Sequence, residues 1–279
     1  MGNWTNVRLP NYLLLKMSEF ERDIGQEILD AVIEIKSRCF DSVLLEDFMS
    51  RFYGYGNYLG DYWLVGMEEG GGNSFADIER RLNTWNERGG QELEDVAEYH
   101  VAMGVTSLFS ERPKIQPTWG KLIRVILAIK GYSPTLNQTR DYQRDWLGRV
   151  ASETCLLELL PLPSPSTGQW IYGEYSELPY LLDRNTYRRA LLGGRMKHLQ
   201  QRIKQYRPKV VLFYSFSYRE QWQTIADADF LPVDEGEFYI GSNETPVFVM
   251  TKHPAATGLS NEYWVRVGHA IAAKLAEQI

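Results

Sequence analysis

Two acidic residues follow shortly after a short apolar run, and three glycines follow them. The run covers residues 62–65, and residues 66–72 then read Gly-Met-Glu-Glu-Gly-Gly-Gly. A buried strand holds the residues at its end in place, the carboxylates of Glu68 and Glu69 can carry out acid–base chemistry, and glycine lets a ligand approach the backbone. This stretch predicts a catalytic or binding site, and the alternative is an ordinary turn between a strand and a helix with solvated acids.

Two later apolar runs also end in residues that can do chemistry. Glu158 stands near the end of residues 154–160, and His253 follows residues 246–251. Apolar runs that alternate with helical patterns predict a parallel sheet covered by helices. In such a sheet the site lies beyond the carboxyl ends of the strands, so Glu68, Glu158 and His253 are expected to converge.

The three motifs, in this order, resemble those of the uracil-DNA glycosylase superfamily, and most closely those of its single-strand-selective branch. That branch has Gly-Met-Asn-Pro-Gly, Asn-Tyr-Cys-Pro-Leu and His-Pro-Ser-Pro. Here the chain has Gly-Met-Glu-Glu-Gly at 66–70, Glu-Leu-Leu-Pro-Leu at 158–162 and His-Pro-Ala-Ala at 253–256. An Asn-x-x-Trp at 261–264 extends the resemblance, which spans residues 60–275. The resemblance implies hydrolysis of the N-glycosidic bond of a base flipped out of DNA.

The resemblance also assigns roles to three side chains. Glu68 falls where the superfamily has its activating Asp or Asn, so it is expected to activate water and to stabilise the positive charge that develops on the sugar. His253 falls on the histidine of the last motif and is expected to stabilise the negative charge on the leaving base. Glu69 replaces a proline of the family motif, so Glu68 and Glu69 could exchange roles.

The residues expected around the base depart from the family pattern. The classical uracil branch bars 5-substituted bases with a tyrosine at the position of Gly70, and a glycine leaves room there. Glu158 replaces the asparagine that reads uracil, and a carboxylate, which only accepts hydrogen bonds, suits the exocyclic amine of cytosine. These changes predict a cytosine with a bulky 5-substituent, such as glucosylated 5-hydroxymethylcytosine in phage DNA, and hence anti-phage defence. The other residues expected to line the base pocket are Gly66, Met67 and Phe75, the last by stacking on the base.

A basic segment and one leucine are expected to contact DNA. Residues 184–209 contain nine Lys or Arg and no Asp or Glu, in a chain of net charge −6. An acid-free basic segment favours contact with phosphates, and a solvated helix face is the alternative. Leu259 follows the last motif, where the family has a wedge residue, and a position in the core is the alternative for it. The residues of the basic segment expected to contact DNA are Arg188, Arg189, Arg195 and Lys197.

The apolar patterns predict an α/β fold with a central, mostly parallel four-stranded sheet flanked by helices. The strands are expected over residues 62–65, 154–160, 209–216 and 247–251. Helices are expected over residues 74–88, 91–109, 118–130, 139–150, 219–226 and 261–277, and within the basic segment. Residues 1–55 are interpreted as a helical N-terminal extension packed on the core, and residues 56–279 as the uracil-DNA glycosylase-like domain.

The composition is that of a globular protein without a cofactor. Of the 279 residues, 44% are hydrophobic and 24% are charged, which is ordinary for a folded domain. No apolar run approaches the roughly 20 residues that span a bilayer. The two cysteines, Cys39 and Cys155, form no Cys-x-x-Cys pair and cannot supply the four ligands of an iron–sulfur cluster. We expect no cofactor, no metal, no membrane contact, a cytoplasmic location and a monomer, and the family resemblance implies DNA as the partner.

Other functions remain open on the sequence. The same fold could remove uracil or another deaminated base in repair. It could also bind nucleic acid or a protein without cleaving anything, because the family's proline and asparagine are both replaced. An unrelated hydrolase could use Glu68, Glu69 and His253 on a nucleoside or around a metal ion. A serine hydrolase is not favoured, since the chain has no Gly-x-Ser-x-Gly motif.

Overall fold

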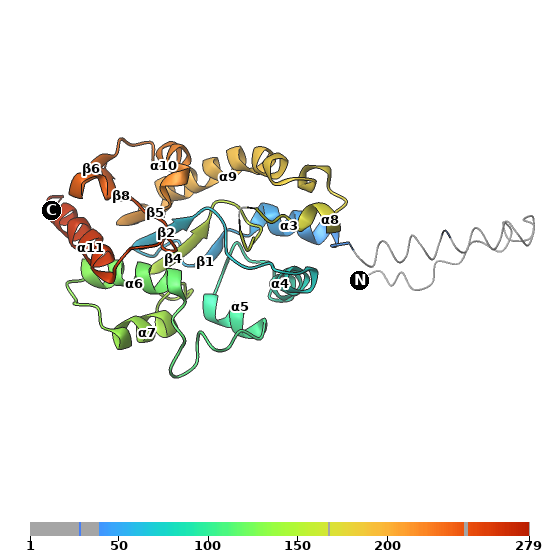
Figure 1. Ribbon diagram of the computed structural model, residues 1–279, viewed down its shortest axis with the longest axis horizontal. Coiled ribbons are helices and arrows are strands. Elements are labelled where there is room, and N and C mark those ends of the chain that lie inside the picture. The colour runs from blue at the N-terminus through green and yellow to red at the C-terminus, as the bar shows by residue number, and fades with distance from the viewer. Residues whose placement is uncertain (1–27, 29–38, 167, 243–244, 279) are drawn as a thin grey trace, which may run out of the picture.

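The four apolar runs form the central strands of a single sheet in the computed structural model of the chain (Figure 1). Leu64 pairs with Leu156 on one side and with Leu212 on the other, and the order β4-β2-β5-β8 is parallel throughout. Because these strands run in the same direction, their carboxyl ends lie along one edge of the sheet. The four strands are β2 (Tyr62–Gly66), β4 (Thr154–Glu158), β5 (Val210–Tyr214) and β8 (Val247–Thr251).

The structure describes residue 28 and residues 39–166, 168–242 and 245–278. Most of the helical extension expected over residues 1–55 lies outside these ranges. Its described part contains α3 (Ser42–Arg51), and the ring of Phe48 lies 5.2 Å from that of Trp85, so α3 shares the main core. Within the described ranges, no helix is both long enough and apolar enough to cross a membrane.

The sheet has eight strands, so the prediction of four was wrong in number. The full order is β3-β1-β4-β2-β5-β8-β7-β6. β1 runs antiparallel to β4, and β7 runs antiparallel to β8, so the antiparallel pairs flank the parallel centre. Three of the outer strands have only two or three residues, and β7 contains a glycine and ends in a serine, so no sustained apolar run marks the outer strands in the sequence. These strands are β1 (Gly54–Gly56), β3 (Leu93–Glu94), β6 (Leu231–Val233) and β7 (Phe238–Ser242).

Helices cover both faces of the sheet. In Figure 1, α9 and α10 lie on one side of the sheet, and α6 and α11 lie on the other. Every residue of β2, β5 and β8 is accordingly buried, which is why these strands are continuous apolar runs. The remaining helices are α4 (Phe75–Glu87), α5 (Val96–Ala102), α6 (Pro117–Ile129), α7 (Leu136–Asp145), α8 (Tyr172–Tyr175), α9 (Arg184–Tyr206), α10 (Arg219–Ala226) and α11 (Asn261–Ala276), with single 3-10 turns at Pro179–Leu181, Phe216–Tyr218 and Asp234–Gly236.

Side-chain caps set where several helices begin. The side chains of Ser74, Asp95 and Asp183 accept hydrogen bonds from backbone N–H groups in the first turns of α4, α5 and α9. The helix expected over residues 91–109 is therefore shorter than predicted. It begins only after the Asp95 cap, with β3 before it, and ends at Ala102.

Candidate active site

Polar side chains lie at or just beyond the carboxyl ends of all four central strands. Glu68 and Glu69 follow β2, Glu158 ends β4, Tyr214 ends β5, and His253 follows β8. The Tyr214 hydroxyl donates a hydrogen bond of 3.0 Å to Oε1 of Glu158, and its ring centroid lies 5.9 Å from that of His253. Tyr214 therefore joins two of the predicted site residues.

Glu69 lies in a cluster of groups that favour its ionised form. Its Oε2 accepts hydrogen bonds of 3.0 Å from the Tyr55 hydroxyl and from Nη1 of Arg81, and its Oε1 lies 3.6 Å from Nε2 of His100. Burial acts to raise the pKa of Glu69, but the charge of Arg81 and the hydrogen bonds from His100 and Tyr55 outweigh it and lower the pKa to about 2. Glu69 is thus a carboxylate at all ordinary pH values.

Glu158 has the opposite environment. Burial, and then the negative charge of Glu69, raise the pKa of Glu158 to about 8, although the hydrogen bond from Tyr214 opposes this shift. Its Oε2 is buried and has no hydrogen-bond partner in the described part of the chain. Glu158 is therefore protonated at neutral pH and can donate a hydrogen bond, which corrects the expectation of a carboxylate that only accepts.

Gly66 makes the contact between Tyr214 and Glu158 possible. A Cβ at this position would lie 2.2 Å from the Tyr214 hydroxyl oxygen and 2.5 Å from Oε2 of Glu158. Both polar groups therefore occupy the space that any other residue at 66 would fill. The glycine of the first motif is required here by close packing of the site rather than by an unusual backbone angle.

Glu68 has different partners from its neighbour Glu69. Its Oε1 forms a close ion pair with Nη2 of Arg184, the first residue of α9. Nη1 of Arg184 donates to the Ser164 hydroxyl at 2.9 Å and to the Ser166 carbonyl at 3.2 Å, so the arginine connects Glu68 to the loop after β4. Oε2 of Glu68 is buried and accepts no hydrogen bond from the described residues. One oxygen of this carboxylate is therefore held while the other remains able to accept.

His253 lies on an exposed loop with its tautomer set by the backbone. The N–H of Ala255 donates to Nδ1 of His253 at 3.0 Å, so the neutral imidazole carries its proton on Nε2. Desolvation, together with the positive charge of Lys121, lowers the pKa of His253 below its ordinary value of 6.5. Lys121 itself donates to the carbonyl of Pro254. At neutral pH His253 is therefore an uncharged hydrogen-bond donor.

The other residues predicted for the base pocket have varied surroundings. Met67 is buried, and a Cβ built on Gly70 meets no heavy atom within 4 Å. The ring of Phe75 stacks on Phe40, with centroids 4.6 Å apart and planes 12° from parallel, and lies 5.3 Å from Tyr175. Phe75 thus belongs to an aromatic cluster, and Phe40 already occupies one face of its ring.

The structure corrects the DNA contact predicted for Arg195. This side chain is 3% exposed, and its guanidinium lies 3.6 Å over the ring of Tyr53. It donates to four backbone carbonyls and so joins α9 to the end of α3 and to the end of β4. A group directed into the core in this way cannot reach a phosphate. The four carbonyls belong to Met49, Phe52, Glu158 and Leu159.

The remaining predicted DNA contacts lie nearer the surface. Arg189 and Lys197 are exposed on α9, and Arg188 is half-buried with its guanidinium 5.6 Å from the ring centroid of Tyr218. Leu259 is half-buried and packs against the core. These positions leave Arg188, Arg189 and Lys197 able to meet a phosphate.

The basic segment is much less charged in space than in sequence. Although residues 184–209 contain no acid, acids from other parts of the chain pair with four of its nine cations. The pairs are Arg184 with Glu68, Arg202 with Glu92 at 2.7 Å, Lys204 with Asp227 at 3.7 Å, and Lys209 with Asp61 at 2.7 Å. The fold therefore neutralises four of the nine positive charges, and the other five cations have no acidic partner among the described residues.

Sequence reasoning missed several side chains of this region, namely Tyr55, Arg81, His100 and Tyr214. Tyr214 had a usable signal, because it ends the third predicted strand and so lies at the same edge as the other site residues. Arg81 and His100 had none. They stand on α4 and α5, and no local pattern indicates that either meets Glu69.

Neither comparisons with known proteins nor a metal-binding arrangement of the described side chains identifies this site. Among the described residues, no group of three or more His, Cys, Asp or Glu side chains is arranged to hold a metal ion. No protein-family model matches the chain, and no curated protein matches it either.

Proposed function

We propose that this chain is a monofunctional DNA glycosylase, which hydrolyses the N-glycosidic bond of a base flipped out of DNA and leaves an abasic site. The observation that carries the proposal is that Glu68, Glu158 and His253 stand at or just beyond the carboxyl ends of β2, β4 and β8, along one edge of the sheet. The sequence resemblance to the uracil-DNA glycosylase superfamily supports the same assignment. Two neighbouring carboxyl groups with pKa values pushed far apart, Glu69 and Glu158, are typical of an acid–base site.

On the sugar side of the bond, Glu68 is the group that acts. Arg184 holds Oε1, and the free Oε2 can accept a hydrogen bond from the attacking water. The same negative charge stabilises the positive charge that develops on the sugar as the bond to the base breaks. Glu69, which is paired with Arg81, adds negative charge nearby without touching the substrate.

On the base side, two neutral donors can stabilise the negative charge that develops on the departing base. The protonated carboxyl of Glu158 and the Nε2–H of His253 can both donate to a departing base. A leaving base gains negative charge in the transition state, so donors at this position lower the barrier. Tyr214 keeps the Glu158 carboxyl oriented through its hydrogen bond to Oε1.

For the substrate we propose a cytosine with a bulky 5-substituent, and we propose defence against phages that carry such bases as the role. A protonated carboxyl offers one donor and one acceptor, so it suits N3 and the amine of cytosine, but it also suits O4 and N3–H of uracil. Glu158 therefore does not discriminate between cytosine and uracil. The open space at Gly70 is what supports the larger base.

A second candidate function is binding of nucleic acid without cleavage. Both acids of the first motif form ion pairs inside the protein, Glu68 with Arg184 and Glu69 with Arg81. A carboxylate neutralised by an arginine of its own chain is also what a purely structural ion pair provides. This observation favours a function without cleavage, because it gives the two acids a structural role instead of a catalytic one.

A base-release assay tests the proposal. The protein is incubated with DNA that contains uracil, unmodified bases, or glucosylated 5-hydroxymethylcytosine, and abasic sites are detected by their cleavage in alkali. Glu68→Gln is the test variant, and Glu87→Gln, an exposed glutamate at the end of α4, is the matched control. We expect release from the modified DNA alone, unchanged in the control and reduced by about 100-fold or more in Glu68→Gln.

Other outcomes of this assay discriminate among the candidates. Release from uracil DNA would keep the glycosylase function and discard the proposed substrate. If no DNA loses a base, or if Glu68→Gln and Glu87→Gln release bases equally well, the glycosylase mechanism is overturned. Absence of release from every DNA favours the binding function.

A further inference from the structure

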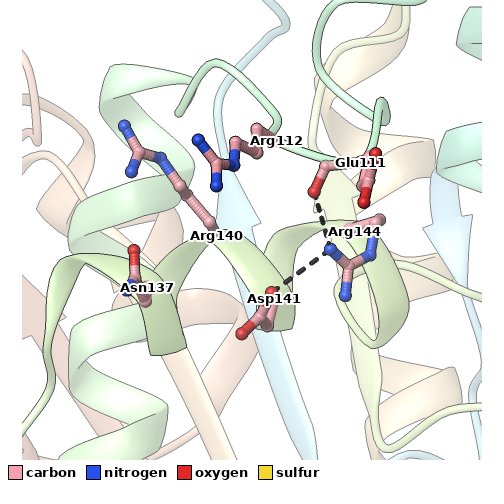
Figure 2. A pocket seen from close by; sticks show the side chains of 6 residues that line it. All are labelled: Glu111, Arg112, Asn137, Arg140, Asp141 and Arg144. Carbon is pink, nitrogen blue, oxygen red and sulfur yellow. Dashed lines mark hydrogen bonds and ion pairs between the residues drawn. The ribbon is translucent and has the colours of Figure 1, made fainter.

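A second charged region lies outside the candidate active site, in a cleft between α7 and the loop that joins α5 to α6 (Figure 2). Its volume is about 520 Å³. No motif of the sequence analysis falls on it. The side chains that line the cleft are Glu111, Arg112, Asn137, Arg140, Asp141 and Arg144.

One of the three arginines is fully engaged by the protein. Arg144 forms ion pairs with Asp141 at 3.2 Å and with Asp145 at 2.6 Å, and it donates to the carbonyl of Glu111 at 3.0 Å. Figure 2 shows the contacts of Arg144 with Asp141 and Glu111 at one end of the cleft. Arg144 and Asp141 therefore neutralise each other and fix the wall of the cleft.

The other two arginines have no such partners. Neither Arg112 nor Arg140 forms a hydrogen bond or an ion pair with any residue in the described part of the chain, and Nε of Arg140 is buried without an acceptor. Both guanidinium groups point to the same side of the cleft, whereas the Glu111 carboxylate lies beyond Arg144 (Figure 2). Neighbouring like charges repel each other, and a buried N–H without an acceptor is destabilising, so a single anion would relieve both costs.

We propose that Arg112 and Arg140 bind a backbone phosphate of the nucleic acid whose base enters the candidate active site. This inference rests on the proposed function, since it takes the ligand to be a nucleic-acid strand. The planar guanidinium group presents paired N–H donors that match the oxygens of a phosphate. The amide of Asn137, on the same side of α7, supplies a further donor.

The cleft is held at a fixed position relative to the candidate active site, as a contact to the same strand requires. Gln143 is fully buried in α7, and its amide donates to the carbonyls of Leu108 and Lys114 in the loop. The helix before this loop carries His100, which lies 3.6 Å from Glu69. The loop that forms one wall of the cleft is thereby connected, through α5 and His100, to Glu69 just beyond β2.

The test compares two doubly substituted proteins that lose the same charge. Arg112→Gln/Arg140→Gln empties the cleft of free cations. Arg266→Gln/Lys274→Gln removes two positive charges elsewhere, both on α11. Affinity for a fluorescent single-stranded oligonucleotide is measured by anisotropy at several salt concentrations. We expect the cleft variant to bind about tenfold more weakly and its slope of log affinity against log salt to fall by about 0.7, with the control near the parent protein.

Three outcomes separate this inference from its alternatives. Equal binding by the cleft variant and the control would overturn it, even if the parent protein releases bases from DNA. Weaker binding by the cleft variant alone would support it, even if no base is ever released. A parallel titration with inorganic phosphate identifies the source of the ligand. If phosphate binds saturably through Arg112 and Arg140 while the affinity for the oligonucleotide stays unchanged in the cleft variant, the cleft binds free phosphate. That result would overturn the contact with a backbone phosphate. Arg112 is exposed, so Arg112→Gln alone repeats the test with little risk to folding.

Discussion

Two arginine-rich regions of this protein differ in what their charges do. The basic segment at α9 is the most cationic stretch of the sequence, with nine Lys or Arg in residues 184–209. The fold supplies partners there: Arg195 donates to backbone carbonyls, and Arg184 and Arg202 meet glutamates from other elements. At the α7 cleft, where acids are interspersed in the sequence, Arg112 and Arg140 have no partner among the described residues.

The difference shows that charge along the chain and charge in space are separate quantities. An arginine paired inside the fold contributes to stability and is unavailable to a ligand. An arginine left unpaired at the surface contributes little to stability and remains free to bind an anion. Substitution of an arginine that has partners in the first region should therefore change the free energy of unfolding, and substitution of Arg112 or Arg140 in the second should change binding alone.

The largest effect is expected at Arg195. Arg195→Ala leaves four buried backbone carbonyls without their donor and removes a ring contact with Tyr53. Because each buried group left unpaired costs about 1–3 kcal/mol, we expect the free energy of unfolding to fall by roughly 3 kcal/mol or more in urea denaturation. Lys197→Ala, two residues along the same helix and exposed, is the control and should change it by less than about 0.5 kcal/mol. Equal effects at the two positions would refute the comparison.

Glu158 extends the comparison to a buried acid. It lies at the carboxyl edge of the sheet, and no cation among the described residues lies beside its carboxyl oxygens. Its pKa is raised from 4.5 to about 8, so the folded state holds this proton more tightly than the unfolded chain. The contribution of the bound proton to the free energy of unfolding is fully present below pH 4.5 and is lost as the pH rises through about 8. Between pH 5 and pH 8 we expect a loss of about 3 kcal/mol in the wild type relative to Glu158→Gln. Parallel curves of stability against pH for the two proteins would contradict the assignment of a protonated Glu158.

The smallest effect on stability is expected at the cleft. Arg112→Gln/Arg140→Gln removes two charges that repel each other and have no partner. The free energy of unfolding should stay within about 0.5 kcal/mol of the parent value or rise slightly, as measured by urea denaturation without added phosphate. A loss comparable to that of Arg195→Ala would mean that these arginines are structural, and the two regions would then be alike.

The central strands could be predicted because a strand that is buried on both faces is a continuous apolar run in the sequence. Residues 62–65 and 247–251 are continuous apolar runs, and β2 and β8 lie there in the structure. The outer strands could not be predicted in the same way. Gly54–Gly56 and Leu93–Glu94 carry no periodic pattern of their own and form strands only because a neighbouring backbone is there to pair with them.

Part of the candidate site could be predicted for the same reason. Glu68, Glu158 and His253 follow strands that the sequence reveals, and parallel strands place their carboxyl ends together. Their protonation states could not be predicted. Glu69 and Glu158 are the same residue type at the same edge, yet the pKa is about 2 for one and about 8 for the other, because only Glu69 has Arg81 beside it.

The sequence by itself determined the α/β class, the four central strands and the edge at which polar residues gather, because these follow from local patterns of apolar and polar residues. Only the tertiary structure decided which charges are neutralised, which carboxyl keeps its proton and which arginines remain free. Those properties depend on contacts between residues far apart in the chain. Arg184 and Glu68 are 116 positions apart, and no local pattern records that they meet.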